Sequence, residues 1–162
     1  YPDDGYDRIW RRFTNYASFG LSPLNGDGSN PTISVTDKPP AAVLRQAITT
    51  SSTLASNLTI PTLIDSPLPV PHYVTFYFVE VSPVNTTRSF DIFLDNQKFY
   101  SKTIDVSNGN AQEIYHPKIA LSTSSTFTLV RTDGSSLPPL INAAEFFMLG
   151  EQWLALGTET SD

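Results

Sequence analysis

The chain has 162 residues, of which 40% are hydrophobic and only 16% charged, and it contains 13 prolines. A chain of this length can bury its own core as one domain, and this composition is typical of a β-rich protein. The formal net charge is -6, and the basic residues are scattered apart from Arg8, Arg11 and Arg12, which argues against nucleic acid as a partner. The absence of cysteine excludes disulfides and thiolate chemistry.

Aromatic residues gather near the N-terminus, at Tyr1, Tyr6, Trp10, Tyr16 and Phe19. Such rings either anchor a first strand in the core or lie at exposed loop tips, where they stack on the apolar faces of sugars. We expect Trp10 to be a core anchor, and for Tyr6 both alternatives stay open. We take Tyr1, Tyr6, Tyr16 and Phe19 as the candidate ligand-binding residues.

The next part of the chain alternates between polar and strand-forming segments. Residues 21–30, which include Gly26 and Gly28, predict a loop, and residues 51–57 predict a second polar loop. Strands are expected around residues 32–36 and 43–49.

The clearest strand signal lies in residues 73–81, a run of β-branched and aromatic residues. Residues 88–94 alternate apolar and polar side chains and predict a second strand. Asp95 and Asn96 tolerate positive φ and predict a two-residue hairpin turn. We therefore expect residues 73–99 to form a paired-strand core.

Further strands are expected at residues 113–121, 125–131 and 141–148, separated by turn-forming clusters. Regular short strands of this kind predict an all-β sandwich. No run approaches the ~18–20 apolar residues that cross a bilayer, so we expect no direct membrane insertion. The missing initial methionine suggests a fragment of a longer protein, without a signal peptide's layout at its start.

Two N-glycosylation motifs are present, one at Asn57 with Thr59 and one at Asn85 with Thr87. Both asparagines neighbour polar or turn residues, where a glycosyltransferase could reach them. The two motifs favour a secreted chain.

The sequence contains no residue pattern that is typical of a catalytic site. His72 and His116 each neighbour a proline and are expected at the surface, and no Gly-x-Ser-x-Gly nucleophile turn is present. Asp3 and Asp4 are adjacent on the chain, so they would point to opposite faces instead of flanking one bond, and capping or exposure to solvent is expected for them. We therefore expect a non-catalytic protein.

Residues 25–30 imitate the start of a calcium loop, with oxygen-bearing side chains at alternate positions. The sixth position lacks the required glycine, however, and Thr36 stands where a bidentate glutamate belongs. We therefore expect no metal and no cofactor.

Four stretches together carry a family resemblance: residues 1–10, 77–81, 88–95 and 137–145. In this order and spacing they resemble the malectin-like domains of plant receptors, over nearly the whole chain. Residues 158–162 look like that family's junction with the next region. We expect residues 1–155 to form one malectin-like lobe and residues 156–162 to begin a linker.

The resemblance implies a jelly-roll antiparallel β-sandwich, here the second of two tandem lobes, with a malectin-like lobe before it. It implies an extracellular place on the ectodomain of a plasma-membrane protein, ahead of leucine-rich repeats, a membrane span and, in some members, a kinase. It also implies a ligand-recognition or scaffold lobe that binds an apoplastic peptide or protein. The alternatives are a module for a cell-wall glycan or glucose disaccharide, and an auxiliary carbohydrate module of a secreted enzyme.

Only some of the sugar-binding residues of animal malectin have counterparts in this sequence. The early tyrosine of that site falls near Tyr6, but its aromatic pair falls at Ser82 and Pro83, and its late aspartate at about Leu137. Because two ring platforms and a carboxylate acceptor are replaced, the resemblance favours a peptide or protein partner over a sugar.

Overall fold

The computed structural model describes residues 4–53, 55–60, 62, 64–82, 87–106 and 109–150. Tyr1, Asn85 and the expected linker at 156–162 lie outside these residues. The elements in chain order are η1 (Ala17–Phe19), β1 (Leu21–Asn25), α1 (Ala41–Leu44), β2 (Gln46–Thr50), β3 (Asn57–Ile60), β4 (Val70–Phe78), β5 (Arg88–Leu94), β6 (Gln97–Lys98), β7 (Ile104–Val106), β8 (Gln112–Leu121), β9 (Phe127–Arg131), β10 (Leu140–Ile141) and β11 (Ala143–Met148).

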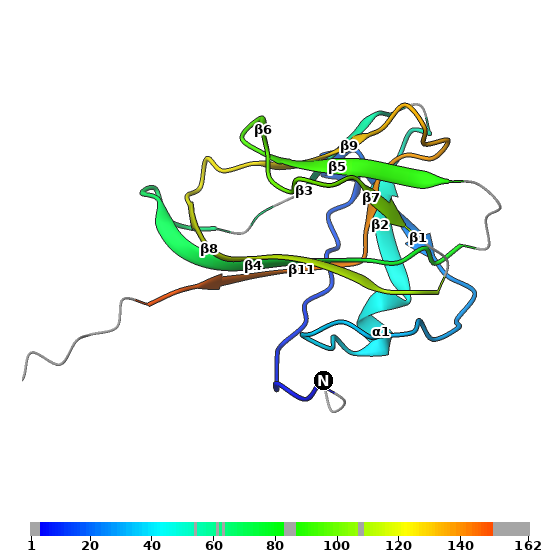
Figure 1. Ribbon diagram of the computed structural model, residues 1–162, viewed down its shortest axis with the longest axis horizontal. Helices are drawn as coiled ribbons and strands as arrows, with labels where there is room; N and C mark the ends of the chain where they lie inside the picture. Colours follow the sequence, from blue (N-terminus) through cyan, green and yellow to red (C-terminus); the bar gives the residue numbers. More distant parts are fainter. Residues whose placement is uncertain are drawn as a thin grey trace, which may run out of the picture.

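The strands form two facing layers, which confirms the predicted all-β antiparallel sandwich. One layer has the order β11-β4-β8, and the other has β3-β9-β5-β6 with β7 paired to β5. A small sheet of order β1-β2-β10 completes the fold, and Figure 1 shows β2 running between the two layers. Segments far apart in the sequence therefore meet within each layer.

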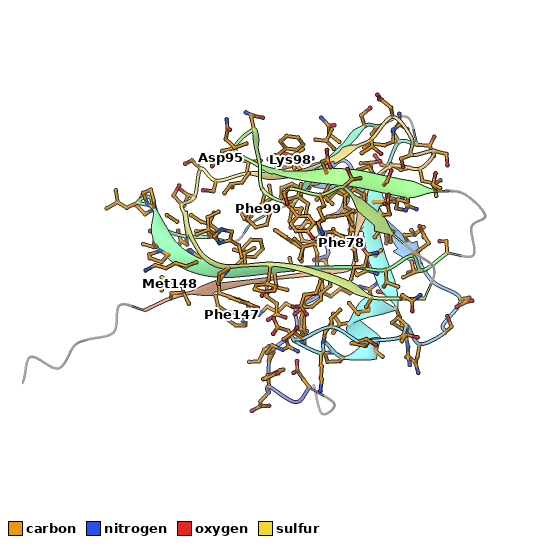
Figure 2. All side chains as sticks on the ribbon, in the orientation of Figure 1. Phe78, Asp95, Lys98, Phe99, Phe147 and Met148 are labelled. Atoms are coloured by element: carbon orange, nitrogen blue, oxygen red, sulfur yellow. The ribbon has the colours of Figure 1, made fainter. Side chains whose placement is uncertain are left out.

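Aromatic rings from both layers fill the core. Phe76 of β4 lies 5.0 Å from Phe127 of β9, and Phe78 lies 5.2 Å from Phe90 of β5, measured between ring centroids. Figure 2 shows Phe78 and Phe99 between the layers. Edge-to-face contacts of this kind add to the hydrophobic effect and fix how the layers pack.

The structure confirms the second predicted strand and its turn. β5 spans Arg88–Leu94 as predicted, and Asp95 and Asn96 take φ values of 48° and 65° before β6. The Asp95 carboxylate accepts a hydrogen bond from the backbone N–H of Thr126 at 2.7 Å, which ties the turn to the start of β9. The strands expected at 113–121 and 125–131 correspond to β8 and β9.

The predicted pairing across residues 73–99 is wrong in one respect. β4 and β5 follow each other in sequence but pair with other strands, β4 with β8 and β11 and β5 with β6, β7 and β9. They face each other across the core because each has an apolar side that must be buried, and two separate sheets achieve this better than one hairpin.

Two predicted segments need correction, and one strand was not predicted. The expected loop at 21–30 begins with β1, an edge strand whose Pro23 is tolerated because one side of an edge strand needs no ladder donors. The strand expected at 43–49 starts as the end of α1 and becomes β2 only at Gln46, and residues 57–60 form β3. These short strands carry polar residues, so their periodicity is weak.

The strand expected at 32–36 is also wrong. Its side chains alternate between half-buried and exposed, but only Thr32 makes a ladder contact, an isolated parallel bridge to Asn110. Ile33 and Val35 pack against buried Tyr77 and Leu44 instead. The alternation is therefore that of an extended segment covering the outer face of the β4 sheet.

Asn142 interrupts the expected strand at 141–148 and divides it into β10 and β11. Its amide Nδ2 donates to the carbonyl oxygens of Leu44 and Gln46, each at 3.1 Å, and its Oδ1 accepts from the N–H of Val79 at 2.7 Å. One side chain thus links the chain around β2 to the end of β4 at the point where the strand changes sheets.

Candidate functional site

A wide hollow lined by described residues lies along one side of the sandwich. This side groove has a volume of about 780 Å³ and runs between residues 8–16, which we call the N-terminal segment, and β11. β2 and β3 also contribute to its lining, with Ala47, Ile48, Leu58 and Ile60. Figure 1 shows the N-terminal segment rising from the β4 layer towards the β5 layer.

The N-terminal segment is held mainly through side chains. Within the described part of the chain, none of residues 9–15 belongs to a strand or makes a backbone–backbone hydrogen bond. Phe13 and Tyr16 pack against the main core instead, and Trp10 packs edge-on against Tyr77 with 6.1 Å between ring centroids. This confirms Trp10 as an anchor, although the first strand expected around it is not formed.

Arg8 is the centre of a buried polar network, the Arg8 cluster, which also contains Asp4, Trp10, Tyr77 and Glu145. Its Nε donates to both carboxylate oxygens of Asp4, at 3.1 and 2.9 Å, and its Nη1 donates to Glu145 Oε1 at 2.7 Å. Trp10 Nε1 donates to Asp4 at 2.5 Å, and the Tyr77 hydroxyl donates to Glu145 at 2.7 Å. The Arg8 side chain is only 10% exposed, so these charges interact with little screening by water.

Further hydrogen bonds connect the Arg8 cluster to residues 32–38, which lie over the outer face of the β4 sheet and which we call the covering loop. Arg8 Nη2 donates to the carbonyl oxygen of Asp37 at 2.7 Å, and the Asp37 carboxylate accepts from the Tyr73 hydroxyl at 2.7 Å. The Asp37 N–H donates to Glu113 of β8 at 3.0 Å. The loop is thereby fastened to all three strands of the β4 sheet.

Burial and hydrogen bonding shift the pKa values of these groups in opposite directions. Burial by itself would raise the pKa of Asp4, but hydrogen bonds from Arg8, Trp10 and the Tyr6 N–H lower it to about 2. Burial raises the pKa of Glu145 despite the opposing effects of Tyr77 and Arg8. Burial, followed by the bond to Glu145, raises the pKa of Tyr77. Asp4 is therefore the member held most firmly as an anion.

We expect acid to destabilise the fold through Asp4. Because its pKa is lower in the folded state, its contribution is present above the ordinary value of 3.8 and is lost as pH falls through about 2. Glu145, with a raised pKa, acts in the opposite sense. Urea unfolding midpoints at pH 5, 4, 3 and 2 should fall less steeply in Asp4→Asn than in the wild type.

The control is Asp133→Asn, which changes an exposed aspartate that has no hydrogen bond or ion pair in the described part of the chain. Its urea unfolding midpoint should fall with decreasing pH as steeply as that of the wild type. If the midpoint of Asp4→Asn falls with pH as steeply as that of the wild type, Asp4 is not the cause of the destabilisation by acid.

A second buried ion pair joins Glu80, two residues after β4, to Arg88 at the start of β5. Arg88 Nε donates to Glu80 at 2.7 Å, and both side chains are almost completely buried. The Arg88 guanidinium also donates to the carbonyl oxygen of Pro138, and Glu80 accepts from the N–H of Ser82 at 3.2 Å. This pair fixes the connection between the layers at the end of the sandwich.

The predicted ligand-binding aromatics fall into two groups. Tyr6 is 61% exposed, and the Arg8 guanidinium lies 5.1 Å from its ring centroid, between it and Trp10. Tyr16 is half-buried and Phe19 is 52% exposed, and Phe13 contacts both of their rings, with centroids 5.6 and 5.5 Å apart. Tyr16 lines the side groove, so it is the predicted residue that lies closest to a hollow large enough for a ligand.

A smaller hollow of about 290 Å³ lies beside Ser82, one of the two residues that the resemblance aligned with the aromatic pair of animal malectin. Its described lining includes Asp27, Arg45 and Glu80 but no aromatic side chain. Asp27 accepts from the Ser29 N–H at 2.9 Å, and Asn30 accepts from Arg45, so two oxygens of the calcium-like loop already have partners. No cluster of three metal-ligating side chains occurs among the described residues.

One expectation about polar residues is wrong, and another is confirmed in one of its two alternatives. His72 is buried, not on the surface, and its Nδ1 lies 2.8 Å from the carbonyl oxygen of Val70. Of the two alternatives expected for Asp4, capping is confirmed and solvent exposure is not: its Oδ1 accepts from the Tyr6 N–H at 3.0 Å, and the side chain is buried within the Arg8 cluster. His72 faces the interior because it lies on the same side of β4 as buried Val74 and Phe76. Asp4 is buried because Arg8 and Trp10 donate to its carboxylate.

The structure also shows surface aromatics that the sequence did not single out. Tyr115 of β8 is 54% exposed and Phe147 of β11 is 47% exposed. Tyr73 of β4 lies between these strands, is paired in register with Phe147 and stacks on Tyr115 with ring centroids 6.1 Å apart. Period-2 alternation on β8 and β11 could have predicted that these rings share the outer face.

The fold has counterparts among solved plant receptor ectodomains. A structure of the plant peptide RALF23 in complex with FER and LLG2 matches with a TM-score of 0.67 and 24% identity, covering 93% of this chain and 45% of that one. The ANX2 ectodomain from Arabidopsis thaliana matches with a TM-score of 0.60 and 16% identity, covering 86% of this chain and 42% of that one. The fold is that of the β-sandwiches in these ectodomains.

The particular family is given by sequence. A family model described as the malectin-like domain matches residues 1–149, and the chain belongs to this family, which confirms the predicted resemblance. A probable LRR receptor-like serine/threonine-protein kinase of Arabidopsis thaliana is 34% identical over 152 residues, and the nodulation receptor kinase of Pisum sativum is 32% identical over 151.

The chain spans only part of these relatives. The matches cover 91% and 90% of this chain but 16% and 15% of the two kinases. In the described part of the chain, no helix is long and apolar enough to cross a membrane.

Proposed function

We propose that this chain is a non-catalytic ligand-recognition and scaffold lobe of a plant cell-surface receptor ectodomain, which binds a peptide or protein partner. The side groove carries this proposal, because its 780 Å³ hollow is bordered by an edge strand and by a segment held mainly through side chains. Grooves of this kind, lined by apolar side chains and a few polar groups, are common binding sites.

The relatives and structural neighbours support a receptor setting. The relatives are receptor-like kinases, and one solved neighbour is a complex with a plant peptide. We therefore propose that the present chain is an extracellular lobe of such a receptor. In the parent protein, a malectin-like lobe would precede it, and residues 156–162 would begin the linker that follows it.

The proposal is tested by partner capture. The parent ectodomain, the same ectodomain lacking this lobe, and the 162-residue chain would be immobilised and exposed to apoplastic peptides, including RALF23, and to purified ectodomains. We expect a defined partner that is bound by the first and third samples and lost from the second. Equal capture by the ectodomain without this lobe would refute a direct role.

A second candidate function is recognition of a cell-wall glycan. Exposed Tyr6 and Phe19 favour it, since free ring faces can stack on sugars. Titration with cellobiose, maltose and pectin fragments, followed by calorimetry and chemical shifts, would test it. No response at millimolar sugar would exclude this candidate, and loss of a response in Phe19→Ala would support it.

A secreted lobe is expected to carry a glycan on Asn57. Asn57 and Thr59 are both exposed on the outer side of edge strand β3, whereas Leu58 and Ile60 between and after them point into the core. Asn57→Gln should remove one glycan per chain without loss of folding, as measured by intact-mass spectrometry of the protein secreted from plant cells.

Asn110→Gln is the matched control, because Asn110 is exposed but not in a glycosylation motif. It should leave the mass of the attached glycans unchanged. The expectation for Asn57 fails if Asn57→Gln also leaves it unchanged.

A further inference from the structure

We infer that the side groove binds an acidic peptide in extended conformation, which adds a strand to the free edge of β11 and places its carboxylates near Arg11 and Arg12. This inference rests on the proposed recognition function and specifies the chemistry of the partner. Three features of the groove support it: an unpaired strand edge, an apolar floor and an excess of guanidinium groups.

The unpaired edge belongs to β11. In the described part of the chain β11 pairs only with β4, in an antiparallel register that sets Phe147 opposite Tyr73. The Leu149 N–H donates to the carbonyl oxygen of Pro71 at 2.8 Å. Because every second residue of an antiparallel ladder bonds to the same partner strand, the backbone groups of Ala143, Glu145 and Phe147 are directed towards β4. The backbone groups of Ala144, Phe146 and Met148 then point to the open side, where an added strand would find donors and acceptors.

The floor of the groove is apolar. Leu58 and Ile60 of β3 and Ile141 at the end of β10 line it, and β11 forms one wall with Ala144 and Phe146. An extended peptide turns alternate side chains to opposite faces, so one half of them would face this floor and the other half would face outward. The six residues of β11 correspond to a peptide segment of about 20 Å.

The charge of the groove is positive although the chain as a whole is acidic. Arg11, Arg12 and Arg45 line it, and none of the three has an ion pair in the described part of the chain. The only carboxylate in its described lining is that of Glu145, which is already paired with Arg8. A partner that supplies carboxylates would therefore complement this surface, whereas a basic partner would be repelled.

The strand edge distinguishes a peptide from an acidic sugar. A peptide backbone offers alternating N–H and C=O groups at the spacing that β11 presents, whereas a polyuronide would match the arginines but not the edge. The two ligands can therefore be separated by removing the edge contacts and the charges independently.

The probe is a fluorescent octapeptide of alternating glutamate and valine, titrated against the 162-residue chain at low salt and followed by anisotropy. We expect saturable binding that weakens as salt is added, and no binding of the matching lysine and valine peptide. Arg11→Gln combined with Arg12→Gln should weaken binding at least about tenfold. The control, Lys102→Gln combined with Lys118→Gln, removes the same charge from exposed positions outside the groove and should leave binding unchanged.

The edge is tested separately by Ala144→Pro, which removes an N–H directed away from β4 and is tolerated at a strand edge. It should abolish binding. Should this variant not fold, the unaltered chain is titrated with two peptides N-methylated at alternate residues. The peptide methylated on the side that faces β11 should lose binding, and the peptide methylated on the other side should keep it.

The inference is overturned if the glutamate peptide does not bind, if the double arginine variant binds it equally well, or if both methylated peptides bind alike. It is also overturned if oligogalacturonate binds the groove and the peptide does not. These results leave the capture experiment intact, because a partner bound elsewhere on the lobe would still support the proposed function.

Discussion

Arg8→Ala is expected to lower the free energy of unfolding by about 3–5 kcal/mol, because it leaves buried carboxylates without their cation. Asp4 and Glu145 are 9% and 8% exposed, and both contact the guanidinium directly. The same change removes the donor to Asp37, so the loop that covers the β4 sheet is loosened as well. Urea unfolding at pH 7 followed by circular dichroism measures the loss.

The matched control is Arg11→Ala, three residues further along the same segment. Arg11 is exposed and has no ion pair with a described residue, so its replacement should change stability by less than about 0.5 kcal/mol. Similar losses in both variants would show that the Arg8 cluster contributes no more than an ordinary surface arginine.

Phe76→Ala is the second change with a large expected effect, a loss of about 3–5 kcal/mol in the free energy of unfolding. Phe76 is fully buried and contacts the rings of Phe78, Phe99, Phe127 and Phe146 at centroid distances of 5.0 to 6.4 Å. Truncation would leave a cavity between the layers that these rings cannot fill without leaving their rotamers. The measurement is again urea unfolding, with thermal unfolding as a second probe.

Phe147→Ala is the control for this core variant, since Phe147 lies on β11 but is 47% exposed. This replacement should lower the free energy of unfolding by less than about 1 kcal/mol. Figure 2 shows Phe147 and Met148 at the end of β11, away from the packed rings between the layers. A cost for Phe76→Ala no larger than this would mean that the core relaxes around the missing ring.

Strand signals in the sequence were reliable where a segment has one buried face and long, apolar side chains. β5 matches its predicted bounds because Phe90 and Ile92 alternate with less buried neighbours. β1 and β3 were missed because they are short and polar, and their register depends on β2 and β9. Which strands pair is decided by packing between distant segments, so the expected pairing of β4 with β5 had no local signal that could correct it.

The candidate binding surface was harder to predict than the fold. The sequence singled out Tyr6, Tyr16 and Phe19, but only Tyr16 lines the side groove. Arg11 and Arg12 were noted as the one local concentration of basic residues, yet their place beside β11 depends on a path of the chain that no local pattern describes. The unpaired edge of β11 is a property of the whole sheet.

The stretches that carry the family resemblance meet in the two buried ion-pair networks. Asp4, Arg8 and Trp10 come from the first stretch, Tyr77 from the second and Glu145 from the last. Glu80 and Arg88 connect the second and third stretches in the same way. The resemblance therefore describes how the lobe is held together, which explains why it predicts the fold more sharply than the ligand.

Asn142 has a consequence for the chemical ageing of the protein. Its side-chain nitrogen donates to two carbonyl oxygens near β2 while its oxygen accepts from the end of β4. Deamidation would replace that nitrogen with a charged oxygen facing two carbonyl groups, and both hydrogen bonds would become repulsions. A one-atom lesion at the point where the strand changes sheets would therefore weaken this junction while leaving every hydrophobic side chain in place.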